Sequence, residues 1–356
     1  MNHKATVKGD TFVLRTYLER VLSNATDVLE SNIVKSHEDF EKFMFGRTKQ
    51  SADLHHYIDR KIDECYKKQQ FSSRDIYKGL KKLLESFSKG KSVQVTDLSV
   101  KWFESLESWY LGRKKSNGDD YKISGYSIYM RHLRIIINEL VDEELISQKD
   151  YPFGKNKYTI PSAENNKRPL ASEDITRLLS YKSDCPFKQH AVDFWKLSYF
   201  WMGINLRDVI KLQWSNVHDD KIYYYRSKTF KRSKVKRKNT VFLDDRTTAV
   251  IDKYIGTGAY IFNVLEESAS EEQKYRAGKN FIRKINQHLK KVAVELDISK
   301  DISSIWSRHS FATEMKKKKV SPYIIQEAFG HKDIKTTENY MSSLVEDDLR
   351  NIQKSL

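Results

Sequence analysis

The sequence has little of what marks a disulfide-built, secreted or membrane protein. Among 356 residues there are only 2 cysteines, 5 prolines and 13 glycines. Cys65 and Cys185 lie far apart and in no CxxC spacing, which excludes a cysteine-based zinc site and fits a reducing cytoplasm. No apolar run reaches the length of about 18 residues that a membrane span needs. The start, MNHKATVKGDTFVL, lacks the apolar core of a signal peptide, so we expect a cytoplasmic protein with no membrane partner.

Positive charge is what the sequence has in excess. Lysine and arginine total 64 against 48 aspartates and glutamates, which gives a formal net charge of +16 and a pI near 9.4. This imbalance indicates a polyanionic partner, with nucleic acid as the first candidate. An acidic membrane surface is the weaker alternative, because no segment has the pattern of a basic helix lying on lipid. A DNA-binding protein of this kind would be associated with the nucleoid.

The length predicts more than one domain, because 356 residues exceed what one ordinary core organises. Few prolines and glycines favour a largely helical protein. We expect residues 1–90 to be a helical N-terminal region of unknown role that ends in a linker, SKGKSVQ, at 88–94. A second helical unit is expected at 95–153, an interdomain linker at 154–170 and the last domain at 170–356.

Two arginines stand out in the unit at 95–153. The segment YSIYMRHLRIIINELVDEELI has apolar residues at helical spacing, and Arg131 and Arg134 fall off that apolar stripe. They are therefore free to meet a partner such as DNA. A solvated basic face explains them equally well on this pattern alone.

The last domain is predicted to be mostly helical with a small β-hairpin. Ser172 is expected to cap its first helix. Further on, KIYYYRSKTF and KNTVFLDD are rich in strand-forming residues and flank the basic run KRSKVKR. Within that run, Lys231, Arg232 and Lys234 are candidate phosphate contacts. In the helical stretch after the hairpin, we expect a helix with Ser321 as N-cap, Pro322 as its first residue and Gly330 as its end.

One stretch of 34 residues carries a specific resemblance. RHSFATEMKKKKVSPYIIQEAFGHKDIKTTENYM, at 308–341, resembles the C-terminal motif block of the tyrosine recombinases, the phage-integrase family. That block has an Arg-His-Ser/Thr-Phe-Ala run, then Leu/Phe-Gly-His, then a tyrosine nine residues after the histidine. GINLRDVIKLQW, at 203–214, is similar to the family's earlier box, and YYYRSKT to its hairpin with a lysine. The resemblance covers roughly 95–350 and looks most like the integrases of Bacteroides-type mobile elements.

The resemblance implies a fold and an activity. It implies a helical, SAM-like core-binding domain at 95–153 and a tyrosine-recombinase catalytic domain at 170–356. The implied activity is site-specific recombination of DNA through a covalent 3′-phosphotyrosine intermediate, in integration, excision or inversion. This chemistry needs no metal, ATP or other cofactor. The implied partners are double-stranded DNA and further copies of the chain in a tetramer on two DNA sites, and the resemblance leaves room for a DNA-bending accessory protein.

The resemblance also assigns four residues. Tyr340 would be the nucleophile, Arg308 would hold the scissile phosphate and His331 would donate a hydrogen bond to it. Lys228 would protonate the leaving oxygen, although neighbouring lysines leave the register of that position open. Such groups fit the chemistry, because a phenol with a pKa of about 10 is a weak nucleophile. Without a divalent metal, the charge that builds on the phosphate oxygens must be met by Arg and Lys.

Two positions depart from the family pattern. Asn205 occupies the place of the first catalytic arginine, and Ile305 stands where a histidine or lysine is usual. Arg207 could reach the phosphate through a local shift, or Arg226, two residues before Lys228, could supply the guanidinium, which we favour narrowly. The third interpretation is a DNA-binding relative that has lost activity.

Two rival functions remain open on the sequence. In an inactive DNA-binding relative, Tyr340→Phe would change nothing. A type IB-like topoisomerase shares the nucleophile chemistry but would relax any supercoiled plasmid. The tail at 342–356, with apolar Leu344, Val345, Leu349 and Ile352, could pack on a neighbouring subunit or fold back on its own core.

Overall fold

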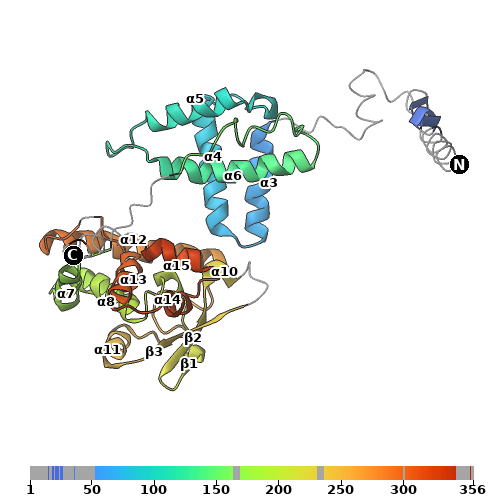
Figure 1. The fold of residues 1–356 in the computed structure, drawn as a ribbon. Coiled ribbons are helices and arrows are strands. Elements are labelled where there is room, and N and C mark those ends of the chain that lie inside the picture. Colours follow the sequence, from blue (N-terminus) through green and yellow to red (C-terminus); the bar gives the residue numbers. More distant parts are fainter. Residues whose placement is uncertain are drawn as a thin grey trace. The chain divides into compact units, whose positions relative to one another are not determined.

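The chain folds into two compact units, Met1–Ala163 and Glu164–Leu356 (Figure 1). The computed structural model describes residues 53–162, 169–230, 236–299 and 301–341, with a few single positions nearer the two ends. The predicted fold class, mainly helical with a small sheet, is confirmed. The expected helical region before residue 49 and the tail at 342–356 lie almost entirely outside the described residues.

The first unit is a helical bundle. Its described elements are α3 (Leu54–Lys67), α4 (Phe71–Phe87), the 3-10 turn η1 (Val95–Asp97), α5 (Val100–Leu111) and α6 (Ile123–Asp142). Figure 1 shows the α3–α4 pair with α5 and α6 lying across it. Leu80 of α4, Phe103 of α5 and Met130 of α6 are fully buried in one hydrophobic cluster. A continuous cluster of this kind makes the four helices one folding unit.

The structure differs from the expected boundaries of this unit. Residues 88–94 are not a linker between separate regions, because Val93 is buried and its carbonyl accepts a 2.8 Å hydrogen bond from the Leu54 amide. The glycine, serine and lysine of this segment suggested a loop, while Val93 and Val95 anchor it in the core. The expected linker at 154–170 also begins inside this unit, where the buried Tyr158 hydroxyl donates to the Tyr126 hydroxyl over 3.0 Å.

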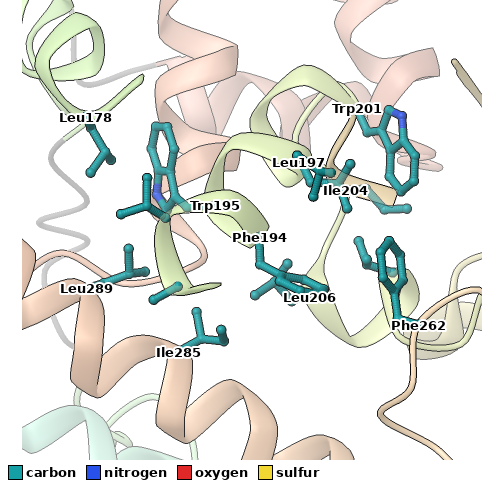
Figure 2. Close-up of a cluster of buried hydrophobic side chains, with 14 of the residues drawn as sticks. Leu178, Phe194, Trp195, Leu197, Trp201, Ile204, Leu206, Phe262, Ile285 and Leu289 are labelled. Carbon is teal, nitrogen blue, oxygen red and sulfur yellow. The ribbon is translucent and has the colours of Figure 1, made fainter. Parts of the chain in front are cut away.

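The second unit is built around one central helix, α8 (Pro186–Phe200). Its helices before the sheet are α7 (Ser172–Ser180), α8 (Pro186–Phe200), α9 (Leu206–Val209) and η2 (Trp214–Asn216). Later in the chain come α10 (Ser227–Phe230), α11 (Asp245–Tyr254), α12 (Glu271–Glu295), α13 (Trp306–Lys317), α14 (Pro322–Phe329) and α15 (Ile334–Met341). Figure 2 shows Phe194 and Trp195 of α8 in the same apolar cluster as Ile285 and Leu289 of α12. This core fixes α8, which leads directly into the first motif box.

A three-stranded antiparallel sheet, ordered β1-β2-β3, stands in this unit. The strands are β1 (Val217–His218), β2 (Lys221–Tyr225) and β3 (Lys238–Phe242), and Tyr224 of β2 is paired with Asn239 of β3. The predicted hairpin is therefore confirmed, but β1 was missed because two residues carry no strand pattern. The first arm was also predicted too long: β2 ends at Tyr225 and the short helix α10 follows. Arg226 and Lys228 thus lie beyond the strand.

The helix ends near the C-terminal motif follow the sequence closely. Ser321 is the N-cap of α14, Pro322 is its first residue and Gly330 ends it in the left-handed conformation, as predicted. Ser172 differs from its expected role, since it is the first residue of α7 and its hydroxyl donates to Glu314 over 2.8 Å. Within the described ranges, no helix has the length and apolar character to cross a membrane.

Candidate active site

Arg308 is the centre of the candidate site. It lies in the first turn of α13 and its side chain is almost fully buried. One guanidinium nitrogen donates to the Gly203 carbonyl over 2.8 Å, and the other donates to the Phe329 carbonyl over 2.9 Å. The guanidinium carbon lies 3.7 Å from the centroid of the Phe329 ring. The Arg308 guanidinium therefore connects the loop after α8 to the end of α14 through two hydrogen bonds.

Gly203 is required for this close approach. Its φ of +71° lies in the region that favours glycine, and an added Cβ would lie 2.8 Å from the Arg308 Cα. Movement of the α13 backbone away from Gly203 would cost free energy, because both terminal nitrogens of the Arg308 guanidinium are hydrogen-bonded. Sequence reasoning used Gly203 only as a landmark for the motif, and its contact with Arg308 is a finding of the structure.

Replacement of Gly203 by alanine is expected to destabilise the second unit by about 3 kcal/mol, from left-handed strain and steric overlap together. Gly90→Ala is the matched control, because Gly90 has a φ of +79° with nothing within 4 Å of an added Cβ. It should cost only about 1 kcal/mol in the first unit. Hydrogen exchange of peptides from each unit measures both values. Equal effects of the two substitutions would show that the Arg308 contact does not matter.

His331 meets Arg308 directly. It follows Gly330 at the end of α14 and is buried, with Nε2 3.0 Å from an Arg308 guanidinium nitrogen and Nδ1 2.9 Å from the Thr337 hydroxyl. Burial, as the largest cause, and the charges of Arg308, Arg226 and Lys228 together lower the pKa of His331 to about 3. The imidazole is therefore neutral at physiological pH.

This low pKa predicts a pH dependence of stability. A histidine of the unfolded chain takes up a proton near pH 6.5, whereas folded His331 does so only near pH 3. The contribution of neutral His331 to the free energy of unfolding is therefore complete above pH 6.5 and is lost as the pH falls toward 3. Between pH 7 and 5 the free energy of unfolding of the second unit should fall by about 2 kcal/mol more in the wild type than in His331→Gln. Identical slopes in urea titrations at both pH values would contradict this.

Arg226 and Lys228 lie close enough to His331 for their charges to lower its pKa. Arg226 directly follows β2, and its guanidinium donates to the Gly330 carbonyl over a long 3.4 Å. Lys228 is exposed on α10, and its charge is felt by His331. Asp208 of α9 holds the start of this segment, since its buried carboxylate accepts the Ser227 amide over 2.9 Å. This bond turns the chain away from the strand direction after Tyr225.

Arg207 takes a different place from Arg226. It lies on α9, where its guanidinium carbon is 5.6 Å from the centroid of the Tyr275 ring of α12. The Asn205 side chain caps α9 by accepting the Arg207 amide over 3.0 Å. Among the contacts described for Arg207, none reaches Arg308 or His331. Ile305 also keeps a backbone role, with its carbonyl accepting the Arg308 amide over 3.1 Å.

Tyr340 lies on α15, the last described helix. It follows Thr337 by three residues, so the two positions are about one helical turn apart on α15. Thr337 is fully buried and bonded to His331. The helix that carries Tyr340 is thus attached to the histidine through Thr337.

The remaining candidates belong to the first unit or lie outside the described residues. Arg131 and Arg134 are exposed on α6 of the first unit, opposite the buried Met130 and Leu133, as their spacing predicted. Lys231, Arg232 and Lys234 lie outside the described residues.

Sequence reasoning missed Asp208, Thr337 and Arg237 as parts of the site. Arg237, just before β3, donates to the His331 carbonyl over 3.2 Å. The sequence could not single out Arg237, because it stands in the basic run KRSKVKR among similar residues. Thr337 stands in the Thr-Thr pair of the quoted motif, but its contact needs the fold of α15 on α14.

Comparison with known proteins identifies the family. Residues 168–346 match the model of the phage integrase family, and residues 53–160 match that of the phage integrase SAM-like domain. The chain therefore belongs to the phage integrase family of tyrosine recombinases, and its function is site-specific DNA recombination. The match at 53–160 agrees with the shared core of α3 to α6 rather than with a domain that starts at 95.

Solved structures share the fold at low sequence identity. The Tn1549 transposon integrase in complex with a circular intermediate DNA has a TM-score of 0.57 at 14% identity, over 85% of this chain and 99% of that one. A lambda integrase dimer bound to a core site has a TM-score of 0.54 at 16% identity, over 81% and 95%. A lambda integrase tetramer bound to a Holliday junction has 0.53 at 15%, over 85% and 84%. No curated protein sequence matches the chain.

Proposed function

We propose that the protein is an active recombinase that cuts and rejoins DNA through a covalent bond between Tyr340 and a 3′-phosphate. The observation that carries this proposal is that three cations, Arg308, Arg226 and Lys228, gather around the buried His331. Arg308 contacts His331, Arg226 reaches the adjacent Gly330 carbonyl, and the charge of Lys228 is felt by the same imidazole. Such an arrangement favours an anion at this place.

The proposed chemistry uses Tyr340, Arg308, Arg226 and Lys228. The Tyr340 phenol gives its proton to solvent water and its oxygen attacks phosphorus, while the bond from phosphorus to the 5′-oxygen breaks. Arg308 and Arg226 offset the charge that grows on the nonbridging oxygens. Lys228, which is exposed on α10, is the proposed donor of a proton to the leaving 5′-oxygen. Because the phosphotyrosine keeps the bond energy, attack by a 5′-hydroxyl reverses the step and rejoins the strand.

Arg226 is proposed as the replacement for the first-box arginine. It lies within 3.4 Å of the Gly330 carbonyl beside His331, whereas Arg207 stacks on Tyr275. Arg226→Ala should therefore lower the rate of covalent adduct formation by about 10²–10³-fold. Arg207→Ala, its matched control, should lower the rate by less than about tenfold. Single-turnover cleavage of a radiolabelled duplex measures both, and the reverse order of effects would assign the role to Arg207.

DNA binding is proposed to involve both units. Arg131 and Arg134 present charge on the outer face of α6, and the chain as a whole carries +16. Contacts between lysine or arginine and phosphate give an affinity that falls steeply with salt. The lambda integrase tetramer on a Holliday junction supports a tetramer on two DNA sites for this chain as well.

The domain division proposed here is a DNA-binding unit at 53–162 and a catalytic unit from 169 onward.

Covalent capture tests the proposed activity. The wild-type protein is expressed in cells that carry its mobile element, the cells are lysed in strong denaturant, and DNA attached to the purified protein is sequenced. An active recombinase retains one discrete sequence. If no DNA is retained, even with a nicked duplex that carries the ends of the element, the protein binds DNA without cutting it. Retention of random DNA, with relaxation of any supercoiled plasmid, would instead indicate a topoisomerase.

A further inference from the structure

The two ring nitrogens of His331 have partners of different kinds. Nε2 lies 3.0 Å from a guanidinium nitrogen of Arg308, which can only donate a hydrogen bond. Nδ1 lies 2.9 Å from the hydroxyl of Thr337, which can either donate or accept. Thr337 is completely buried, so solvent does not compete for this bond.

These partners determine where the single proton of the neutral ring lies. A hydrogen bond from Arg308 requires a lone pair on Nε2, so the ring proton must be on Nδ1. Nδ1 then donates to the Thr337 oxygen, which acts as the acceptor. The surroundings keep the ring neutral, since Arg308 on α13 and both Arg226 and Lys228 after β2 are positive, and Arg237 binds the His331 carbonyl.

This tautomer is the wrong one for the role expected of His331. An Nε2 without a proton cannot donate a hydrogen bond to a phosphate oxygen. When a scissile phosphate takes up the Arg308 guanidinium, Nε2 loses its donor and faces an anion instead. A neutral ring can then contribute only if its proton moves to Nε2.

We propose that Thr337 is a positioning residue that sets the tautomer of His331 and reverses its hydrogen bond when the scissile phosphate binds. In the free protein its hydroxyl accepts from Nδ1, and in the DNA complex its hydroxyl donates to Nδ1. During a local opening that admits water, the ring gives its Nδ1 proton to water and takes another from water at Nε2, so its charge is unchanged. The second half of this proposal rests on the proposed function, while the first half concerns the free protein alone.

Nitrogen NMR of protein labelled with ¹⁵N-histidine tests both halves. The chain has 10 histidines, and His331→Gln identifies the signals of His331. At pH 7 the free protein should show a protonated Nδ1 and an unprotonated Nε2. A protonated Nε2 in the free protein would overturn the assignment, whatever the protein does to DNA. In the uncleaved complex of Tyr340→Phe with the duplex recovered by covalent capture, the two nitrogens should exchange states. Two protonated nitrogens, or an unchanged pair, would overturn the reversal.

Two substitutions of Thr337 separate positioning from packing. Thr337→Val keeps the shape but not the hydroxyl, and should slow adduct formation about tenfold, the factor expected for one lost hydrogen bond, with DNA affinity unchanged. Thr337→Ser keeps the hydroxyl and should stay within about twofold of the wild type. A serine variant as slow as the valine variant, or a valine variant as fast as the wild type, would contradict the proposal. If the valine variant does not fold, the serine variant and the wild-type spectra still decide.

Discussion

Tyr340→Phe is expected to abolish the covalent protein–DNA adduct and to leave DNA affinity unchanged. Phenylalanine keeps the ring and removes only the oxygen that would attack phosphorus. Loss of a nucleophile typically lowers a rate by on the order of 10⁴–10⁶-fold, which takes the adduct below detection. DNA binding depends on lysine and arginine contacts and should keep its steep dependence on salt. Denaturing gel electrophoresis with a nicked duplex measures the adduct, and filter binding measures affinity.

Tyr323→Phe is the matched control for this substitution. Tyr323 lies on α14 and is 71% exposed, so the same chemical change should leave both readouts at the wild-type level. An adduct that persists in Tyr340→Phe and disappears in Tyr323→Phe would move the nucleophile to α14. An adduct that persists in both would point to another of the 20 tyrosines.

Arg308→Ala is expected to have the second largest effect, because it acts on both chemistry and stability. Adduct formation should fall by about 10²–10³-fold, since the variant loses the guanidinium that lies 3.0 Å from His331 and is proposed to hold the phosphate. The free energy of unfolding of the second unit should fall by about 2–4 kcal/mol, because the Gly203 and Phe329 carbonyls lose their donor. Hydrogen exchange and single-turnover cleavage measure the two effects on the same protein.

Arg308→Lys separates these two effects. Lysine keeps the positive charge near His331 but cannot span the two carbonyls as the planar guanidinium does. We expect a smaller loss of stability than in the alanine variant, together with cleavage that stays at least about tenfold slow. Cleavage at the wild-type rate in either variant would remove Arg308 from the proposed chemistry.

The sequence was most informative where a residue's role depends on its neighbours in the chain. The apolar periodicity of 126–146 predicted which arginines of α6 are exposed, and the Ser321-Pro322…Gly330 pattern predicted both ends of α14. It failed at 88–94, where a loop-like composition concealed the buried Val93. It also failed after Tyr225, where a bond from a distant carboxylate, Asp208, ends the strand. Tertiary contacts of this kind leave no local pattern.

The candidate site shows the same division. Motif spacing selected Arg308 and His331, and the structure brings these two side chains into contact. Spacing could not decide between Arg207 and Arg226, because the choice depends on whether a side chain turns toward α12 or toward Gly330. Nor could it indicate that Gly203 supports Arg308, since the two residues are brought together only by the fold.

Mass spectrometry of the captured adduct is the most direct test of the central claim that Tyr340 bonds to DNA. Trypsin cuts after Lys335 and Arg350, and the peptide at 336–350, TTENYMSSLVEDDLR, contains Tyr340 as its one tyrosine. After nuclease digestion of the adduct, the account predicts that this peptide carries a nucleotide through its 3′-phosphate, with fragment ions that place it on Tyr340. A nucleotide on any other peptide, or none on this one despite a captured adduct, would contradict the account.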